Sequence, residues 1–211
     1  MTVALEVKIY HLAIKVIVKG NLKEEFFLAI ILASQSPRRK ELLARLVADF
    51  KVEPADIDET VKKTDLPEEY VIHMAKEKAK VIAAKHPNDL VIASDTIVVN
   101  HGKILGKPES RAEAFTMLKD MSGGMHHVYT AVVMRKGHQV LQELVPAKVL
   151  FFELSDEEIN RYLDTGEYAD KAGAYGIQGQ ASLFVKKVDG DYYSIVGFPV
   201  GVVNQMLKKI N

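Results

Sequence analysis

The sequence predicts a mixed α/β fold, in which helices pack against a twisted sheet. From residue 28 onward, strand-like apolar runs alternate with segments of helical periodicity, a pattern typical of α/β proteins. Two β-rich runs, 127–135 and 139–152, follow one another directly and favour an antiparallel hairpin. The sheet is therefore expected to be mixed rather than wholly parallel. With 211 residues, 48% of them hydrophobic and 27% charged, the chain can bury a substantial core.

The expected strands are short runs of apolar and β-branched residues. In chain order they cover 27–32, 50–52, 90–99, 127–135, 139–152, 183–188 and a returning strand at 192–196. Residues 136–138 form the turn of the first hairpin, and Asp189-Gly190 predicts a tight turn between the last two strands.

The expected helices carry recognisable start signals. The first begins at Ser36-Pro37, the second covers 67–84 with a proline near its start, and a last helix follows Gly197-Phe198-Pro199. Two more helices, ending near residues 119 and 163, begin with the capping-box pairs Ser110 with Glu113 and Ser155 with Glu158.

Composition excludes several kinds of site. Lys+Arg and Asp+Glu number 28 each, so any nucleic-acid surface would have to be a local patch. The absence of cysteine excludes disulfides, thiolate metal sites and a cysteine nucleophile, and it is compatible with a cytoplasmic protein. No apolar run is long enough to span a membrane. Residues 1–27 lack the order of a signal peptide and are expected to form an extension, either an added strand or poorly ordered, before a domain at 28–211.

The junction between the first strand and the first helix carries the most informative stretch, Ala33 to Leu43. Two hydroxyls, a proline and two arginines, Arg38 and Arg39, lie where helix N–H groups are unpaired and the helix dipole is positive. One interpretation is a phosphate-binding turn. The other is an ordinary N-cap, with Ser36 as the cap, followed by solvated arginines.

Carboxylates are the second group of candidates. Asp95 interrupts a strand that is otherwise apolar on both faces, and a buried carboxylate usually has a partner, a metal or a catalytic role. The alternative is an aspartate that caps a loop at the end of the strand. Asp58 and Glu59 lie in an acidic loop that could bind a divalent cation, although such loops are more often simply solvated.

The remaining candidates are weaker when taken singly. Lys78 belongs to a charged helical stretch that normally faces water, and Lys107 lies on a stiff loop between Gly106 and Pro108. His126 and His127 are neighbours in a strand, so they point to opposite faces and one is expected to pack or cap. Gln178 lies in the glycine-rich stretch 170–179, which is either a close approach to a ligand or an ordered turn.

Seven motifs occur together in one order. They are SQSPRRKELL at 34–43, Asp58-Glu59, Ser94-Asp95-Thr96, Gly106-Lys107-Pro108, Ser122-Gly123 with His126, Val128 and Thr130, DKAGAYGIQG at 170–179, and Gly197-Phe198-Pro199. From about residue 28 to its end the chain resembles the Maf family, known as septum-formation-inhibitor-like proteins and as nucleoside triphosphate pyrophosphatases. The resemblance implies two lobes around a central cleft, a fold related to the inosine triphosphate pyrophosphatases, and a divalent cation, Mg²⁺ or Mn²⁺. The 170–179 stretch is similar to the branch that acts on dTTP and UTP.

The resemblance also implies a role for each candidate residue. Asp95 would accept a proton from water and, with Glu59, bind the metal, while Gln178 would line the site. The phosphates would be held by Ser34, Arg38, Arg39, Lys78 and Lys107. The chain departs from the family pattern in its N-terminal extension and in Ser94, where a small apolar residue is common; neither change affects this set.

Two other functions stay open on the sequence. A nucleotide- or nucleic-acid-binding regulator of cell division would show salt-sensitive DNA binding without turnover, but zero net charge and 8% aromatic residues make nucleic acid an improbable partner. The second alternative is a purine-selective house-cleaning enzyme of the related inosine triphosphate pyrophosphatase family. The preferred base is not fixed by the sequence, and modified pyrimidines are possible substrates. A homodimer could form through residues 139–152.

Overall fold

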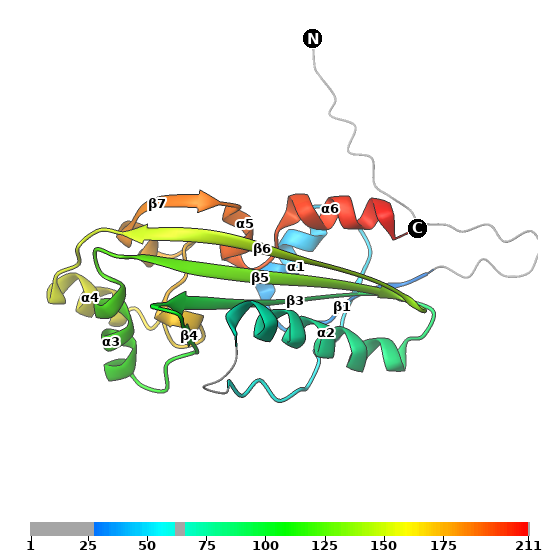
Figure 1. The fold of residues 1–211 in the computed structure, drawn as a ribbon, viewed down its shortest axis with the longest axis horizontal. Coiled ribbons are helices and arrows are strands. Elements are labelled where there is room, and N and C mark those ends of the chain that lie inside the picture. Colours follow the sequence, from blue (N-terminus) through cyan, green and yellow to red (C-terminus); the bar gives the residue numbers. More distant parts are fainter. Residues whose placement is uncertain (1–27, 62–65, 211) are drawn as a thin grey trace, which may run out of the picture.

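A computed structural model describes residues 28–61 and 66–210, so expectations for residues 1–27 lie outside the described part. Seven strands form one mixed sheet in the order β2-β1-β3-β5-β6-β7, with β4 paired to β3 (Figure 1). The strands are β1 Ile30–Leu32, β2 Lys51–Val52, β3 Leu90–Asn100, β4 Lys103–Leu105, β5 Met125–Lys136, β6 Gln139–Phe151 and β7 Val185–Gly190. The α-helices are α1 Pro37–Ala44, α2 Pro67–Lys85, α3 Arg111–Met121, α4 Asp156–Leu163, α5 Tyr192–Val196 and α6 Val200–Lys209. Short 3₁₀ helices lie at Ala172–Ala174 (η1) and Gln180–Phe184 (η2). The predicted fold class, a mixed sheet with flanking helices, is confirmed.

The sheet has an apolar core on each face. The α2 helix covers one face, and α1, α5 and α6 lie over the other (Figure 1). Successive side chains of a strand point to opposite faces, so Leu90 and Ile92 of β3 belong to the core on the α1 side while Val91 and Ala93 belong to the core under α2. β3 therefore contributes side chains to both cores and is buried along most of its length.

Along one edge of β3 the strand pairing is interrupted. β1 runs parallel to β3 and its pairing ends at Leu32 opposite Ile92, whereas β4 runs antiparallel and its pairing ends at Leu105 opposite Val98. The carboxyl ends of β1 and β4 thus face each other across residues 93–97. Ligands of open α/β sheets bind beyond the carboxyl ends of strands, where the chain leaves the sheet.

Most expected elements form, including the β5–β6 hairpin with its turn at Gly137-His138. The capping box of α4 is complete. In α3 only half of it forms: Ser110 Oγ accepts from the Glu113 amide, but the Glu113 carboxylate accepts from the amide of Glu109 rather than from Ser110. The short strand β4 was not predicted, and the strand expected at 183–188 is displaced to 185–190 because η2 occupies 180–184.

The hairpin expected at Asp189-Gly190 is wrong. Both residues belong to the β6–β7 ladder, opposite Lys148 and Ala147. The expected returning strand 192–196 is the helix α5 instead, because Asp191 Oδ1 accepts hydrogen bonds from the amides of Tyr193 and Ser194 at 2.7 and 3.1 Å. An aspartate cap of this kind starts a helix. Among the described residues no helix is long and apolar enough to cross a membrane.

Candidate active site

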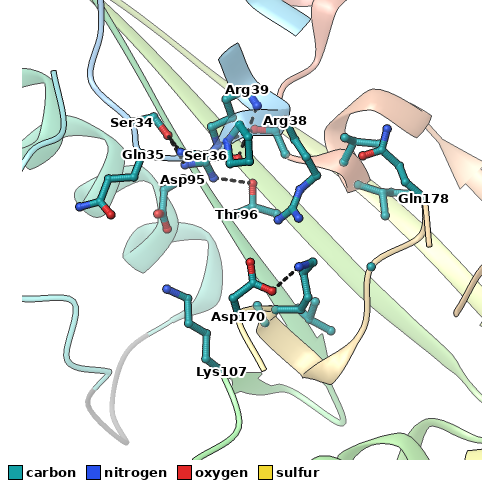
Figure 2. A pocket seen from close by; sticks show the side chains of 18 of the residues that line it. Ser34, Gln35, Ser36, Arg38, Arg39, Asp95, Thr96, Lys107, Asp170 and Gln178 are labelled. Carbon is teal, nitrogen blue, oxygen red and sulfur yellow. Dashed lines mark hydrogen bonds and ion pairs between the residues drawn. The ribbon is translucent and has the colours of Figure 1, made fainter. Parts of the chain in front are cut away.

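A cavity of about 740 Å³ opens at the gap beside β3 (Figure 2). This volume suits a small-molecule ligand. Its walls come from the turn after β1, the start of α1, the middle of β3, the loop after β4, and the segment 167–179. All eight residues predicted to form the site line it: Ser34, Arg38, Arg39, Glu59, Lys78, Asp95, Lys107 and Gln178.

The turn between β1 and α1 combines the two interpretations of its sequence. Ser36 is the N-cap of α1, with Oγ accepting from the Arg39 amide at 3.4 Å, and Pro37 occupies the first turn. Ser34 Oγ, nearly buried, accepts from the Ser36 amide at 3.1 Å. The cap is therefore ordinary, but the arginine beside it is not solvated.

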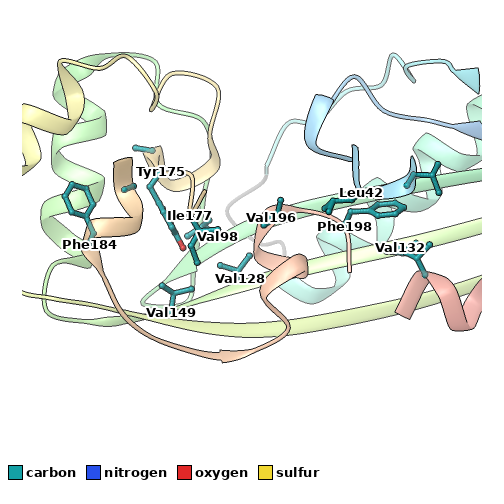
Figure 3. Packing of buried hydrophobic residues seen from close by; sticks show 14 of the residues in the cluster. Leu42, Val98, Val128, Val132, Val149, Tyr175, Ile177, Phe184, Val196 and Phe198 are labelled. Carbon is teal, nitrogen blue, oxygen red and sulfur yellow. The ribbon is translucent and has the colours of Figure 1, made fainter. Parts of the chain in front are cut away.

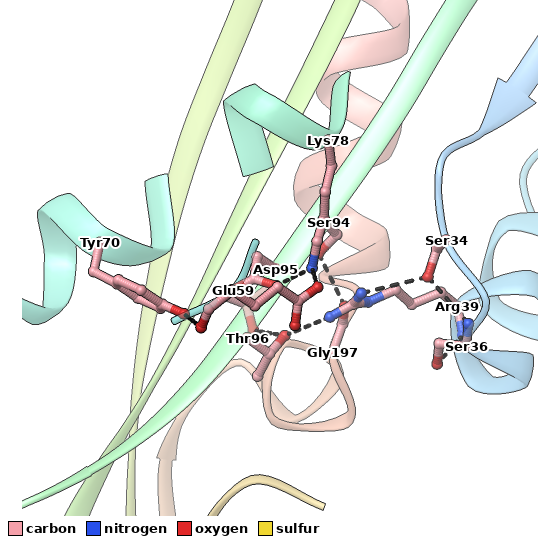
Figure 4. Close-up of polar contacts among 11 residues, drawn as sticks. Ser34, Ser36, Arg39, Glu59, Tyr70, Lys78, Ser94, Asp95, Thr96 and Gly197 are labelled. Atoms are coloured by element: carbon pink, nitrogen blue, oxygen red, sulfur yellow. Dashed lines mark hydrogen bonds and ion pairs between the residues drawn. The ribbon is translucent and has the colours of Figure 1, made fainter. Parts of the chain in front are cut away.

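Arg39 is tied to the protein through all three of its guanidinium nitrogens (Figure 4). Nε donates to the Gly197 carbonyl at 2.9 Å, Nη1 to Ser34 Oγ at 3.4 Å and Nη2 to Thr96 Oγ1 at 3.2 Å. Burial lowers the pKa of Arg39, an effect partly opposed by the charge of Asp95. Because a guanidinium stays protonated in proteins, a positive charge is fixed at this wall.

Lys78 and two carboxylates form an ion cluster on the α2 side of β3 (Figure 4). Lys78 Nζ lies 2.6 Å from Asp95 Oδ1 and 2.7 Å from Glu59 Oε1. Lys78 and Asp95 are 7% and 8% exposed, whereas the Glu59 side chain is 50% exposed. Burial raises the pKa of Glu59, but the hydrogen bond and charge of Lys78, with Lys107 and Arg39 further away, outweigh it, so the net shift is downward.

The expectation that Lys78 belongs to a water-facing stretch is wrong. Lys76 and Lys80 are exposed, but Lys78 lies on the buried face of α2. It follows Met74 by four residues and precedes Ile82 by four, the spacing of one helix face. Helical spacing therefore aims its long side chain at the sheet, where Asp95 is the side chain on the same face. A lysine within an apolar stripe signals such a buried partner.

Three cations of the cavity have no carboxylate partner within the described part of the chain. No ion pair joins Arg38, Arg39 or Lys107 to an acidic side chain there. Figure 2 shows Arg38 and Lys107 extending into the same space from opposite walls. Unpaired positive charges that converge in a concave site attract a polyanion.

The segment 167–179 closes the site on the side of the β4 loop. The Gly173 amide donates to the Gly106 carbonyl at 3.0 Å, which joins this segment to the loop of Lys107. Tyr175 packs among apolar residues under the segment (Figure 3), and its hydroxyl lies 2.8 Å from Nε2 of the buried His126. The expectation that one of the two adjacent histidines packs is thus confirmed. Gln178 is exposed at the rim.

Comparison with known proteins shows the family of this chain. Residues 29–210 match the family described as Maf-like protein. The chain belongs to the Maf-like family. It is 47% identical over 178 residues to a protein of Latilactobacillus sakei named dTTP/UTP pyrophosphatase, covering 84% of this chain and 98% of the relative. Proteins of the same name from Fusobacterium nucleatum and Pyrococcus abyssi are 46% and 45% identical, over 86% and 85% of this chain and 95% of each relative.

Solved structures resemble this Maf-like chain more distantly. The Ham1 protein of Staphylococcus aureus aligns with a TM-score of 0.47 at 14% identity, over 87% of this chain and all of the other. Protein VC0702 from Vibrio cholerae aligns with a TM-score of 0.36 at 11% identity, over 65% of this chain and 70% of the other.

Three residues that line the Maf-like site received no role from the sequence, although Thr96 and Lys171 belong to two of the quoted motifs. Thr96 supports Arg39, Glu167 Oε2 accepts from the Gln180 amide at 3.0 Å, and the ammonium of Lys171 pairs with Asp170 at the cavity wall. For Thr96 the available signal was the strand period, which places its side chain on the face opposite to Asp95. Glu167 and Lys171 carry no comparable signal, because their positions depend on contacts across a loop.

The Maf-like site offers oxygen ligands suitable for a divalent cation. Glu59 and Asp95 converge on a single ammonium, so their carboxylates are neighbours. No group of three or more His, Asp or Glu side chains arranged for a metal occurs in residues 28–61 and 66–210. Mg²⁺ is usually held by one or two carboxylates together with substrate phosphates, and this pair fits that pattern.

Proposed function

We propose that this Maf-like protein hydrolyses nucleoside triphosphates, dTTP and UTP first among them, to the monophosphate and pyrophosphate, a house-cleaning role in the nucleotide pool. The observation that carries the proposal is the combination, in one cavity, of three unpaired cations with the Glu59–Asp95 carboxylate pair. The name of the relatives, dTTP/UTP pyrophosphatase, supports the reaction and the base. Nothing in the site favours the alternative of a regulator without turnover.

The cationic wall would bind the triphosphate. Arg38 and Lys107 reach into the cavity from opposite sides, and Arg39 adds a fixed charge to its wall. The Ser34 hydroxyl and the amides at the start of α1 add donors for phosphate oxygens. Catalysis of phosphoryl chemistry depends mainly on such positioning and charge neutralisation.

Asp95 would activate water. Its Oδ1 is held by Lys78, and Oδ2 makes no hydrogen bond with the described residues, so that oxygen is free to accept a proton. The water oxygen would bond to the α-phosphorus as the bond from that phosphorus to the bridging oxygen of the β-phosphate breaks. Pyrophosphate leaves and the proton passes to Asp95.

Glu59 and Asp95 would hold a divalent cation, Mg²⁺ or Mn²⁺. When bound, it would supply neutralisation of phosphate charge. Gln178 lines the rim beyond the phosphate-binding cations, where a side-chain amide could both donate to and accept from a pyrimidine edge. Modified pyrimidines belong to the same proposal, because the rim is open at Gln178.

The test is pyrophosphate release from a panel of nucleoside triphosphates with Mg²⁺ or Mn²⁺. Wild-type protein should turn over dTTP and UTP in preference to purine nucleotides, and a chelator should abolish the activity. Asp95→Asn keeps the shape of the side chain and should lower kcat by at least about 100-fold. No turnover of any nucleotide, or equal turnover by Asp95→Asn, would contradict the proposal.

Two further statements belong to the same proposal. A homodimer through β6 is supported by the partly exposed apolar side chains Val140, at 44%, and Phe152, at 48%, which lie along and just after that strand. Light scattering of the purified protein tests it. The cytoplasmic location expected from the sequence is tested by cell fractionation.

A further inference from the structure

The buried ammonium of Lys78 occupies the place between two carboxylates where a cation would be drawn. Its Nζ donates a hydrogen bond to Asp95 Oδ1 at 2.6 Å and forms an ion pair with Glu59 Oε1 at 2.7 Å, so one ammonium contacts both proposed metal ligands. Lys78 is 7% exposed, and its neighbours on the same face of α2 are apolar. Water therefore screens the contact with Asp95 little, and the contact with the half-exposed Glu59 more.

The cluster is assembled from rigid parts. Asp95 lies in the middle of β3, and Lys78 lies in the middle of the 19-residue helix α2. Tyr70 lies about two turns before Lys78 in α2, and its hydroxyl donates to the Glu59 carbonyl at 2.7 Å, which fixes the acidic loop against the same helix. The helix, the strand and the acidic loop thus bring the three charges together.

We infer that Lys78 is a positioning residue that holds Glu59 and Asp95 together and keeps their affinity for a divalent cation low until a nucleotide is present. The inference rests on the proposed function for the nucleotide. An ammonium and a divalent cation compete for the same carboxylate oxygens, and their like charges repel at short range. Lys78 thus acts as an internal counter-ion of the two carboxylates.

The nucleotide changes this balance. A triphosphate brings several negative charges next to Lys78, which can then donate to phosphate oxygens and release the two carboxylates. The same triphosphate supplies oxygen ligands that complete the coordination of a divalent cation. Cation and nucleotide are therefore expected to bind cooperatively, with Lys78 as the source of the coupling.

The experiment is a calorimetric titration of Mn²⁺ into nucleotide-free protein. Lys78→Gln removes the charge but leaves an amide that can donate to both carboxylates, and it should bind Mn²⁺ at least about tenfold more tightly than wild type. Lys80→Gln is the matched control: it makes the same change on the same helix, at an exposed side chain paired with Glu77. It should bind Mn²⁺ as the wild type does.

Two additional arms sharpen the result. Adding Glu59→Gln to Lys78→Gln should abolish the gain in affinity. The titration is repeated with a non-hydrolysable deoxyuridine triphosphate analogue that carries an α,β-imido bridge. The ratio of the Mn²⁺ affinities of Lys78→Gln and wild type should then be smaller, because Lys78 has moved to phosphate. Equal Mn²⁺ affinity of wild type and Lys78→Gln without nucleotide, or a ratio unchanged by the analogue, would overturn the inference.

A measurement on the native chain covers the case in which Lys78→Gln does not fold. Lysine side chains labelled with ¹⁵N give a signal for the Lys78 ammonium, assigned by its loss in Lys78→Arg. Saturating Mg²⁺ should shift that signal and leave the Lys80 signal in place; Mg²⁺ binding with no change at Lys78 would overturn the inference. Failure of the proposed function looks different, because it is an absence of pyrophosphate release by wild-type protein whatever its affinity for Mn²⁺.

Discussion

Arg39 donates from Nε to the carbonyl oxygen of Gly197, 2.9 Å away, and so ties α1 to the turn between α5 and α6. These residues are 158 positions apart in the chain. Ser94 Oγ donates to the same carbonyl at 3.0 Å, so strand β3 shares the junction. One carbonyl thus joins three elements at the cationic wall of the cavity, and Arg39 serves the fold as well as the site.

The two neighbouring arginines should therefore respond differently to truncation. Arg39→Ala leaves the Gly197 carbonyl with one donor fewer and Thr96 without its guanidinium partner, so it should lower the melting temperature and reduce kcat/KM by about 100-fold or more. Arg38→Ala should raise KM while changing the free energy of unfolding by only about 0.5 kcal/mol. Thermal melts and steady-state kinetics on both variants check this; equal losses of stability would contradict it.

Thr96 links Arg39 to the buried Thr130 through a short chain of hydroxyls. Its Oγ1 accepts from Arg39 Nη2 and lies 2.8 Å from Thr130 Oγ1, which in turn donates to the Ser194 carbonyl at 2.7 Å. Thr96→Val keeps the shape of the side chain but leaves Arg39 Nη2 and Thr130 Oγ1 without this hydrogen-bond partner. We expect the free energy of unfolding to fall by about 1–3 kcal/mol. Urea denaturation measures it.

A matched threonine separates this network effect from the substitution itself. Thr116 is exposed, and its hydroxyl bonds only to the Ala112 carbonyl one helical turn earlier among the described contacts. Thr116→Val should therefore change the free energy of unfolding by about 0.5 kcal/mol at most. If Thr96→Val is equally mild, the hydroxyl chain does not stabilise the site.

The sequence predicted which side chains line this cavity better than it predicted the contacts that hold them in place. Asp95 was identifiable because a carboxylate inside an apolar strand is costly, and the turn at Ser36-Pro37 because it combines a cap with cations. The position of Gly197 next to Arg39 was not predictable, since it depends on contacts between segments far apart in the chain. The helix α5 was missed for a local reason. The Asp189-Gly190 dipeptide was interpreted as a turn, but both residues pair with β6, and the cap at Asp191 starts a helix directly afterwards.

Gly173 is required by its surroundings as well as by its backbone. Its φ is +66°, and a Cβ built there would lie 2.9 Å from Val98 Cγ1, in the core that Figure 3 shows beneath the segment 170–179. Gly173→Ala should therefore displace this segment, lower the melting temperature and reduce kcat/KM, with a cost of about 1–3 kcal/mol in the free energy of unfolding.

Gly102 provides the control for that change. Its φ is +75°, but a Cβ there would meet nothing within 4 Å. Gly102→Ala introduces the backbone strain alone, costing about 1 kcal/mol, and should leave kcat/KM unchanged. Comparable losses of activity in the two variants would show that the contact with Val98 is not what holds the segment.

His126 should make the stability of the protein sensitive to acid. Burial, with a smaller contribution from the charge of His127, lowers the pKa of His126 to about 4, against about 6.5 for an exposed imidazole. Between these values the unfolded chain binds a proton that the folded protein does not, so the free energy of unfolding falls as the pH falls from about 6.5 to about 4. The loss attributable to this one group is up to roughly 3 kcal/mol.

Denaturant titrations across this pH range measure the effect. His126→Gln removes the titrating ring but keeps a group that can bond to the Tyr175 hydroxyl, 2.8 Å away in the native protein, and it should flatten the pH dependence. His127→Gln changes the half-buried neighbour on the opposite face and should keep most of the wild-type slope. Other groups that titrate in this range are common to wild type and variants and cancel in the comparison. A His126→Gln profile as steep as that of wild type would show that His126 does not govern the acid sensitivity of the fold.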